Sequence, residues 1–146
     1  MRAAQVWVLI TALACSDDEG ARLERSEFND EGSLCVRTGE AGELLISVVV
    51  DGCASGCARI VDSACEVDAD GADLFIHSTI TVEQRRGPGG VCPDACVPIG
   101  VSCAPMQVAS GDYLFHYGGN ISAARLPNEA ALLLGGGGSQ PELQCR

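Results

Sequence analysis

The sequence predicts an all-β fold, a small sandwich of about seven short strands. Three observations lead to this expectation. Several short segments are rich in β-branched residues or alternate apolar and polar residues with a period of two. Glycine-containing turn signals separate these segments, and no stretch has the apolar spacing of a convincing amphipathic helix. Nine cysteines in 146 residues indicate that disulfides cross-link the domain.

The first three predicted strands lie between residues 34 and 67. Two of them are Leu34–Arg37 and Glu43–Asp51. The second is rich in β-branched residues and apolar on both faces, which is typical of a central, buried strand. A third strand is expected within Ala58–Val67.

Asp70-Gly71 predicts a tight hairpin turn, because two-residue turns of this kind need positive φ angles. The strand that follows alternates with a period of two, so its two faces differ in character. We expect the more apolar face to be buried. That face carries Leu74, Ile76, Ser78, Ile80 and Val82, and the other carries Phe75, His77, Thr79 and Thr81.

Three more strands are expected after residue 100. Val101–Val108 has a weak strand pattern, and Asp112–Tyr117 alternates again. A glycine-rich turn at residues 118–120 leads into the last strand, Ile121–Leu126, which Pro127 ends. The side chains expected to face inward from the alternating strand are Tyr113, Phe115 and Tyr117.

The segment Val108–Phe115 contains Gly111-Asp112-Tyr113 just before a predicted strand. It resembles the G-x-Y entry to a late strand in immunoglobulin-like domains. The resemblance implies an immunoglobulin-like sandwich in which the Tyr113 hydroxyl bonds to upstream backbone at a sheet corner. Trp7 is the only tryptophan and lies outside the predicted domain, so the Cys…Trp…Cys pattern of antibody domains is absent.

The first residues have the regions of a secretory signal peptide, namely a positive charge at Arg2, an apolar run over Val6–Leu13, and small residues before a cleavage site. The apolar run is too short to span a bilayer. Ala12-Leu13-Ala14-Cys15 resembles the lipobox of bacterial lipoproteins. The resemblance implies cleavage before Cys15 and acylation of its sulfur and its new amino terminus, which together give stable membrane anchoring.

Residues 15–33 are expected to form a flexible tether between lipid and domain. From Ser16 to Ser33 there are seven acidic residues against two arginines, few apolar positions and no strand alternation. By the same lipoprotein resemblance, Ser16 in place of Asp after the lipidated cysteine implies the outer membrane. The expected organisation is a signal peptide (1–14), a tether (15–33), a Cys-rich β domain (34–127) and a Gly-rich tail (128–146), in which residues 128–134 are candidates for a helical turn.

Nine cysteines leave one without a partner in an oxidising compartment. If Cys15 carries lipid, an even number remains, and we expect four disulfides that supply much of the stability of a domain poor in aromatic residues. The sequence does not choose among the pairings, although Cys145 is placed to hold the tail to the domain. The expected disulfide cysteines are Cys35, Cys53, Cys57, Cys65, Cys92, Cys96, Cys103 and Cys145.

Two motifs recur in the chain with the same offset of 39 residues. Cys53-x3-Cys57 returns as Cys92-x3-Cys96, and Asp73–His77 returns as Asp112–His116. A duplicated unit and chance similarity of loop-and-strand segments both explain this recurrence.

His77 and His116, the only histidines, suggest a zinc hypothesis, because each follows an aspartate by four residues. Four residues of strand span about 13 Å, so each aspartate is too far from its own histidine to share one ion. Only a pair of the two histidines across neighbouring strands fits this hypothesis. The alternative is that both are solvated side chains on strands.

Asp68, Asp70 and Asp73 surround the predicted hairpin and suggest a calcium hypothesis. A helical calcium loop needs glycine at its sixth position and glutamate at its twelfth. Here glycine is fourth and the twelfth residue is Thr79, so an Asp-rich hairpin turn is the simpler interpretation. Weak calcium binding by the clustered acids stays an alternative.

No catalytic residue and no cofactor are expected. The sequence lacks a nucleophile elbow, a phosphate loop and an H-E-x-x-H motif. The two C-x3-C pairs lack the C-x2-C spacing of redox sites and favour structural disulfides. A net charge of −11 argues against binding to nucleic acid.

The sequence therefore predicts a non-enzymatic lipoprotein held at the bacterial cell envelope by its lipid, acting as a structural or binding module. The layout of lipobox, acidic tether and Cys-rich β domain resembles uncharacterised bacterial lipoproteins. The alternative is a secreted β module that binds calcium or zinc.

Overall fold

The structure, a computed structural model, describes residues 22–50, 54–86, 97–128, 130–135 and 145. Within these ranges the chain is all β, with ten strands and no helix. The strands form two sheets in a sandwich-like arrangement, so the predicted fold class is confirmed, with more strands than expected. In the same ranges, no helix has the length and apolar character needed to cross a membrane.

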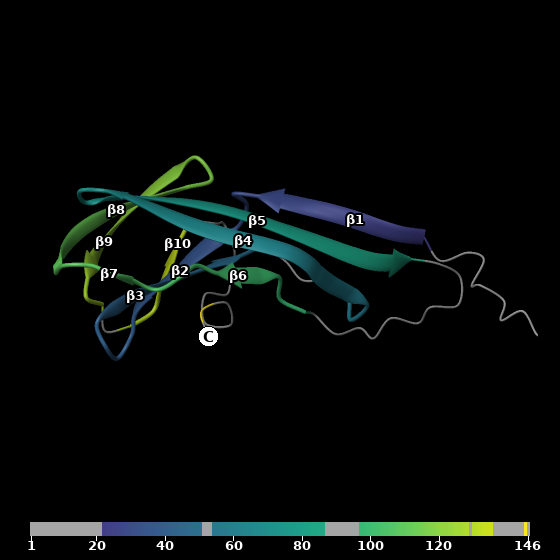
Figure 1. The fold of residues 1–146 in the computed structure, drawn as a ribbon, viewed down its shortest axis with the longest axis horizontal. Coiled ribbons are helices and arrows are strands. Elements are labelled where there is room, and N and C mark those ends of the chain that lie inside the picture. Colours follow the sequence, from purple (N-terminus) through teal and green to yellow (C-terminus); the bar gives the residue numbers. More distant parts are fainter. Residues whose placement is uncertain (1–21, 51–53, 87–96, 129, 136–144, 146) are drawn as a thin grey trace, which may run out of the picture.

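The first sheet is built around a long strand, β5 (Asp73–Arg86), which runs through the middle of Figure 1. The strand order is β1-β5-β8-β9, and one more strand, β4, also pairs with β5. These partners are β1 (Arg22–Asn29), β4 (Ala58–Asp70), β8 (Gly111–Tyr117) and β9 (Asn120–Leu126).

The second sheet has the order β10-β2-β3-β6, and a short strand, β7, also pairs with β3. Its members are β2 (Ser33–Thr38), β3 (Glu43–Val49), β6 (Gly100–Ser102), β7 (Met106–Gln107) and β10 (Leu132–Leu134). The weak strand predicted over Val101–Val108 is thus two short strands, β6 and β7.

The core lies between the sheets and is mainly aliphatic. The predicted inward face of β5 is confirmed, since all five of its residues are buried. Thr81 is also buried although it lies on the opposite face, because Glu27 of β1 and Asp62 of β4 flank it in register. The core residues with the least exposure include Leu34, Val36, Leu44, Val48, Leu74, Ile76, Ile80 and Phe115.

The predicted turns and the predicted sheet corner are confirmed. Gly71 has a φ of 63° in the hairpin between β4 and β5, where Asp70 pairs with Asp73. At the entry to β8, the Tyr113 hydroxyl donates a hydrogen bond to the Ala109 carbonyl at 2.8 Å. This is the contact that the resemblance to immunoglobulin-like domains implied.

The expectation of a flexible tether over residues 15–33 is wrong for its second half. Arg22–Asn29 forms β1 and pairs antiparallel with the second half of β5. This strand is exposed except for Phe28, which packs against the core. Because the backbone pairing needs no apolar alternation, the largely polar sequence of this strand gave no strand pattern to detect. The predicted signal peptide, Cys15 and Ser16 lie outside the described residues.

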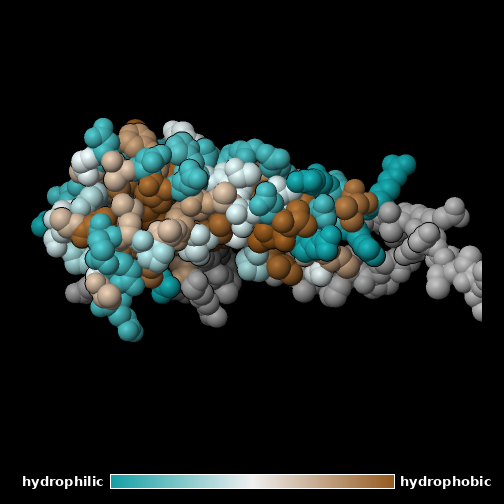
Figure 2. Space-filling view, in the orientation of Figure 1, coloured by the Kyte–Doolittle hydropathy of each residue, from teal (hydrophilic) through white to brown (hydrophobic). Residues whose placement is uncertain are grey.

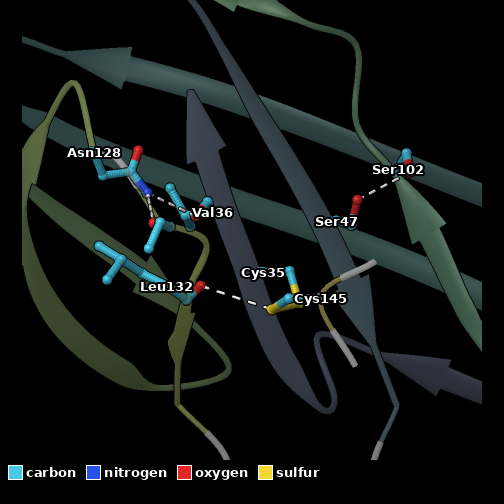
Figure 3. The surroundings of a disulfide bond; sticks show 8 residues. Cys35, Val36, Ser47, Ser102, Asn128, Leu132 and Cys145 are labelled. Atoms are coloured by element: carbon cyan, nitrogen blue, oxygen red, sulfur yellow. Dashed lines mark hydrogen bonds between the residues drawn. A yellow bond between two sulfur atoms is a disulfide. The ribbon is translucent and has the colours of Figure 1, made fainter. Parts of the chain in front are cut away.

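The expected Gly-rich tail also holds structure that the sequence did not predict. Leu132–Leu134 forms β10 and pairs with β2, in place of a helical turn. Asn128 fixes the approach to this strand through its side-chain amide, which donates to the Val36 carbonyl at 3.1 Å and accepts from the Thr38 hydroxyl at 2.8 Å (Figure 3).

Disulfides join distant parts of the chain. Cys145 bonds to Cys35 of β2, which confirms that it holds the tail to the domain (Figure 3). Cys65 of β4 bonds to Cys103, the residue after β6, and so links the two sheets. Cys57 is also disulfide-bonded. The other three candidates, Cys53, Cys92 and Cys96, lie outside the described residues.

Candidate functional site

Two strands meet end to end along one edge of β5. β4 pairs with β5 along nearly its whole length, which leaves the opposite edge for β1 and β8. β1 pairs antiparallel over Thr79–Arg86, and β8 pairs parallel over Asp73–Phe75. The carboxyl-terminal ends of β1 and β8 therefore face each other beside residues 76–78.

Asp30 fills the gap between these two strand ends. Its backbone N–H donates to the Ser78 carbonyl at 3.0 Å, and its side-chain Oδ1 accepts from the Ser78 N–H at 2.6 Å. Its φ of 51° lies in the left-handed region, which aspartate tolerates better than most residues. One residue thus satisfies both backbone groups of Ser78 where neither strand reaches.

A polar chain that is buried at its Ser78 end lies beneath the gap. The Tyr117 hydroxyl donates to the Glu31 carbonyl at 2.8 Å and lies 2.9 Å from the Ser78 hydroxyl. A hydroxyl has one hydrogen and two acceptor sites, so Tyr117 can donate to Glu31 and accept from Ser78 at once. The chain ties the end of β8 to the segment that follows β1.

Two aspartate–histidine pairs lie on the outward side of the same region. His77 of β5 places Nδ1 3.3 Å from Oδ2 of Asp30. His116 of β8 places Nε2 2.6 Å from Oδ1 of Asp73. The His77 side chain is 62% exposed and that of His116 is 23% exposed, so both pairs face solvent.

An apolar row crosses the outer face of the sheet next to these pairs. The register places Phe75 beside His116, and His116 beside Ile121 of β9. The rings of Phe75 and His116 stack with centroids 4.4 Å apart and planes inclined by 19°. Phe75 is 36% exposed and Ile121 is 64% exposed. Apolar surface also lies among hydrophilic side chains elsewhere on the molecule, as Figure 2 shows for one face.

These elements enclose an open groove of about 590 Å³, which we call the β5 groove. A second hollow of about 290 Å³ adjoins it, because both are lined by Asn29, Asp30 and His77. Glu66 of β4 lines the second hollow. The β8–β9 turn at Gly118–Asn120 forms the far rim of the groove. No arginine of the described ranges lines either hollow.

The structure brings His77 and His116 to one groove but does not pair them with each other. Their strands are neighbours, as the zinc hypothesis required, but the parallel register places His116 opposite Phe75. Each histidine instead has its own aspartate as partner. In the described ranges, no three histidine, cysteine, aspartate or glutamate side chains are grouped to hold a metal ion.

The three aspartates of the calcium hypothesis are spread over the β4–β5 hairpin. Asp68 is opposite Phe75 in the register, and Asp70 is opposite Asp73 beside the turn. Asp73 is engaged by His116, while the other two are exposed. The two motifs that recur in the sequence place Asp73–His77 in β5 and Asp112–His116 in β8, as neighbours in one sheet.

Sequence analysis did not single out Asp30 or Ile121, and it named Phe75 only as a residue of the outward face. The signal for Phe75 and Ile121 was an apolar side chain on the solvent side of an alternating strand. The role of Asp30 depends on where two distant strands end, and no local pattern indicates it.

Comparisons of the chain with protein-family models, curated proteins and solved structures find no match.

Proposed function

We propose that this chain is a lipid-anchored, non-enzymatic binding module of the bacterial cell envelope, placed at the outer membrane. The proposal of anchoring rests on the Ala12–Cys15 sequence, which resembles a lipobox. Disulfides such as Cys35–Cys145 and Cys65–Cys103 are typical of proteins that fold in oxidising compartments, which supports export.

The β5 groove is the proposed binding surface. The observation that carries this proposal is the combination of exposed apolar side chains, Phe75 and Ile121, with a hollow on the outer face of a sheet. Exposed apolar surface rimmed by polar residues is typical of interaction sites. Two hydrogen bonds fix Asp30 to the Ser78 backbone next to His77, so this part of the polar rim is ordered by the sheet itself.

Binding is favoured over nucleophilic catalysis by the partners of the histidines. A histidine that activates a nucleophile lies within hydrogen-bond distance of a hydroxyl or thiol. In the part of the chain that the structure describes, His77 and His116 each contact an aspartate, and neither hydrogen-bonds to a serine, threonine or cysteine.

Anchoring is tested by the intact mass of protein purified from membranes. We expect Cys15 to be the new amino terminus and to carry acyl chains, and a Cys15→Ser variant to leave the membrane fraction. An unmodified Cys15 in membrane-derived protein would overturn the anchoring proposal.

The binding surface is tested by retention of the purified full chain on envelope fractions. We expect Ile121→Ser to reduce retention, because Ile121 lines the groove and is largely exposed. Leu23→Ser is the matched control, since Leu23 is 55% exposed on β1 and does not line the groove. Equal retention of the two variants would contradict a role for the groove.

A further inference from the structure

We propose that the β5 groove binds an extended basic peptide segment of a partner protein, with arginine or lysine side chains alternating with apolar ones. This inference rests on the proposed function and names the chemistry of the partner.

The shape of the site fits an extended chain. The groove and the hollow that adjoins it form a trough across the outer face of the first sheet, on either side of the Asp30–His77 pair. The exposed side chain of His77 lines both hollows, whereas Ile121 lines the groove and not the hollow that adjoins it. An open trough leaves much of a small molecule in solvent, whereas a peptide makes contacts along its whole length.

The apolar end of the trough fits a flat or aliphatic side chain. The Phe75 and His116 rings are stacked almost parallel, and Ile121 lies next to His116 in the register. A guanidinium group packs well on the face of an aromatic ring, and the aliphatic stem of arginine or lysine covers apolar surface. A side chain of this kind uses both the rings and Ile121.

The charge around the trough selects a cation. Glu66 lies opposite His77 and Asp68 lies opposite Phe75, both on the outward face of β4. Both carboxylates are exposed, and neither forms an ion pair with a residue of the described ranges. Asp30 and Asp73 add two more carboxylates next to the rings. An anionic ligand would be repelled here, and a neutral glycan would leave Glu66 and Asp68 without a partner.

The test uses the full chain in detergent and a fluorescent, acetylated and amidated hexapeptide of sequence Arg-Leu-Arg-Tyr-Arg-Leu, with binding followed by anisotropy. The comparison ligands are the same peptide with each Arg replaced by Gln, and the neutral sugar chitotetraose. We expect the arginine peptide to bind, the glutamine peptide to bind much more weakly, and added salt to weaken the complex.

Two matched double variants locate the site. Glu66→Gln/Asp68→Asn removes carboxylates beside the trough, and Asp62→Asn/Asp70→Asn removes two from the same strand outside it. We expect the first pair of changes to weaken binding of the arginine peptide by about two- to thirtyfold, which is the range for two exposed ion pairs. We expect the second pair to change affinity less than the first, because Asp62 and Asp70 lie opposite Thr81 and Asp73, which line neither hollow, whereas Glu66 and Asp68 lie opposite His77 and Phe75, which do. Ile121→Ser should weaken binding of the peptide as well.

Three outcomes overturn the inference. The first is no binding of the arginine peptide, and the second is equal weakening of its binding by both double variants. The third is binding of chitotetraose that Ile121→Ser abolishes and Glu66→Gln/Asp68→Asn leaves unchanged. If Ile121→Ser lowers retention on envelope fractions while the peptide does not bind, the groove stands as the binding surface and only the basic peptide is wrong. If Ile121→Ser changes neither the retention on envelope fractions nor the binding of the peptide, both proposals fail.

Discussion

The side chain of Asp30 accepts a hydrogen bond from the backbone N–H of Ser78 at 2.6 Å, while the Ser78 carbonyl accepts from the Asp30 N–H at 3.0 Å. Asp30 therefore pairs with β5 at a point where both β1 and β8 have ended. Since a backbone group left without a partner away from water costs free energy, this residue allows one strand to serve two partners along a single edge. The β5 groove lies directly outside this junction.

Replacing Asp30 with alanine is expected to destabilise the domain by about 1–3 kcal/mol, because the Ser78 N–H loses its acceptor. Asn in its place keeps an acceptor oxygen and tolerates the positive φ, so Asp30→Asn should cost less than Asp30→Ala. Urea unfolding followed by circular dichroism measures both free energies. Asp112→Ala, at an exposed position of β8, is the control. Equal stability of Asp30→Ala and the unchanged protein would contradict the role given to Asp30.

The β8–β9 turn approaches the same junction closely at Gly118. A Cβ atom there would lie 2.6 Å from the Asp30 carbonyl oxygen, and φ is +55°. At Gly119 φ is +77°, but a Cβ would meet nothing within 4 Å. Both Gly→Ala changes carry the strain of positive φ, about 1 kcal/mol, and only Gly118→Ala adds a backbone clash. We expect thermal melts to rank Gly118→Ala clearly below Gly119→Ala, and the reverse order would show that the approach does not matter.

The sandwich was predictable because the sequences of its core strands alternate between residues that are buried and residues that are not. Residues 74–82 alternate with a period of two, and the structure buries the face that this alternation selects. β1 was not predictable in the same way. Its side chains are exposed apart from Phe28, and its pairing depends on backbone hydrogen bonds, which a polar sequence makes as readily as an apolar one.

Sequence analysis named part of the candidate site, and named it as possible metal ligands. His77, His116 and Asp73 were all singled out, and the structure brings them to one face. The parallel register between β5 and β8, which a sequence does not reveal, sets His116 beside Phe75 and within reach of Asp73. A metal pair of histidines required a different register.

The Cys35–Cys145 disulfide is expected to hold the C-terminal segment in place. The two cysteines are 110 residues apart, and β10 pairs with β2 through only three residue pairs. Replacing both by serine should lower the free energy of unfolding by about 2–4 kcal/mol, because the unfolded chain gains freedom. It should also make the chain after Asn128 sensitive to protease while the core stays resistant, as mass spectrometry of the fragments can show. Unchanged protection of that segment would mean that β10 and Asn128 hold it in place without the disulfide.

Tyr117 and Tyr113 offer a matched pair of hydroxyl deletions on one strand. The Tyr117 hydroxyl bridges Ser78 and the Glu31 carbonyl, so Tyr117→Phe removes a partner of the buried Ser78 hydroxyl. The Tyr113 hydroxyl bonds to the Ala109 carbonyl at an exposed corner, where water can replace it. We expect Tyr117→Phe to cost about 1–3 kcal/mol and Tyr113→Phe about 0.5–1.5 kcal/mol in urea unfolding. Amide hydrogen exchange should rise at residues 30–32 in the first variant only, because Tyr117 ties β8 to that segment. Equal losses in the free energy of unfolding, with no local change in exchange, would mean that Asp30 alone stabilises this junction.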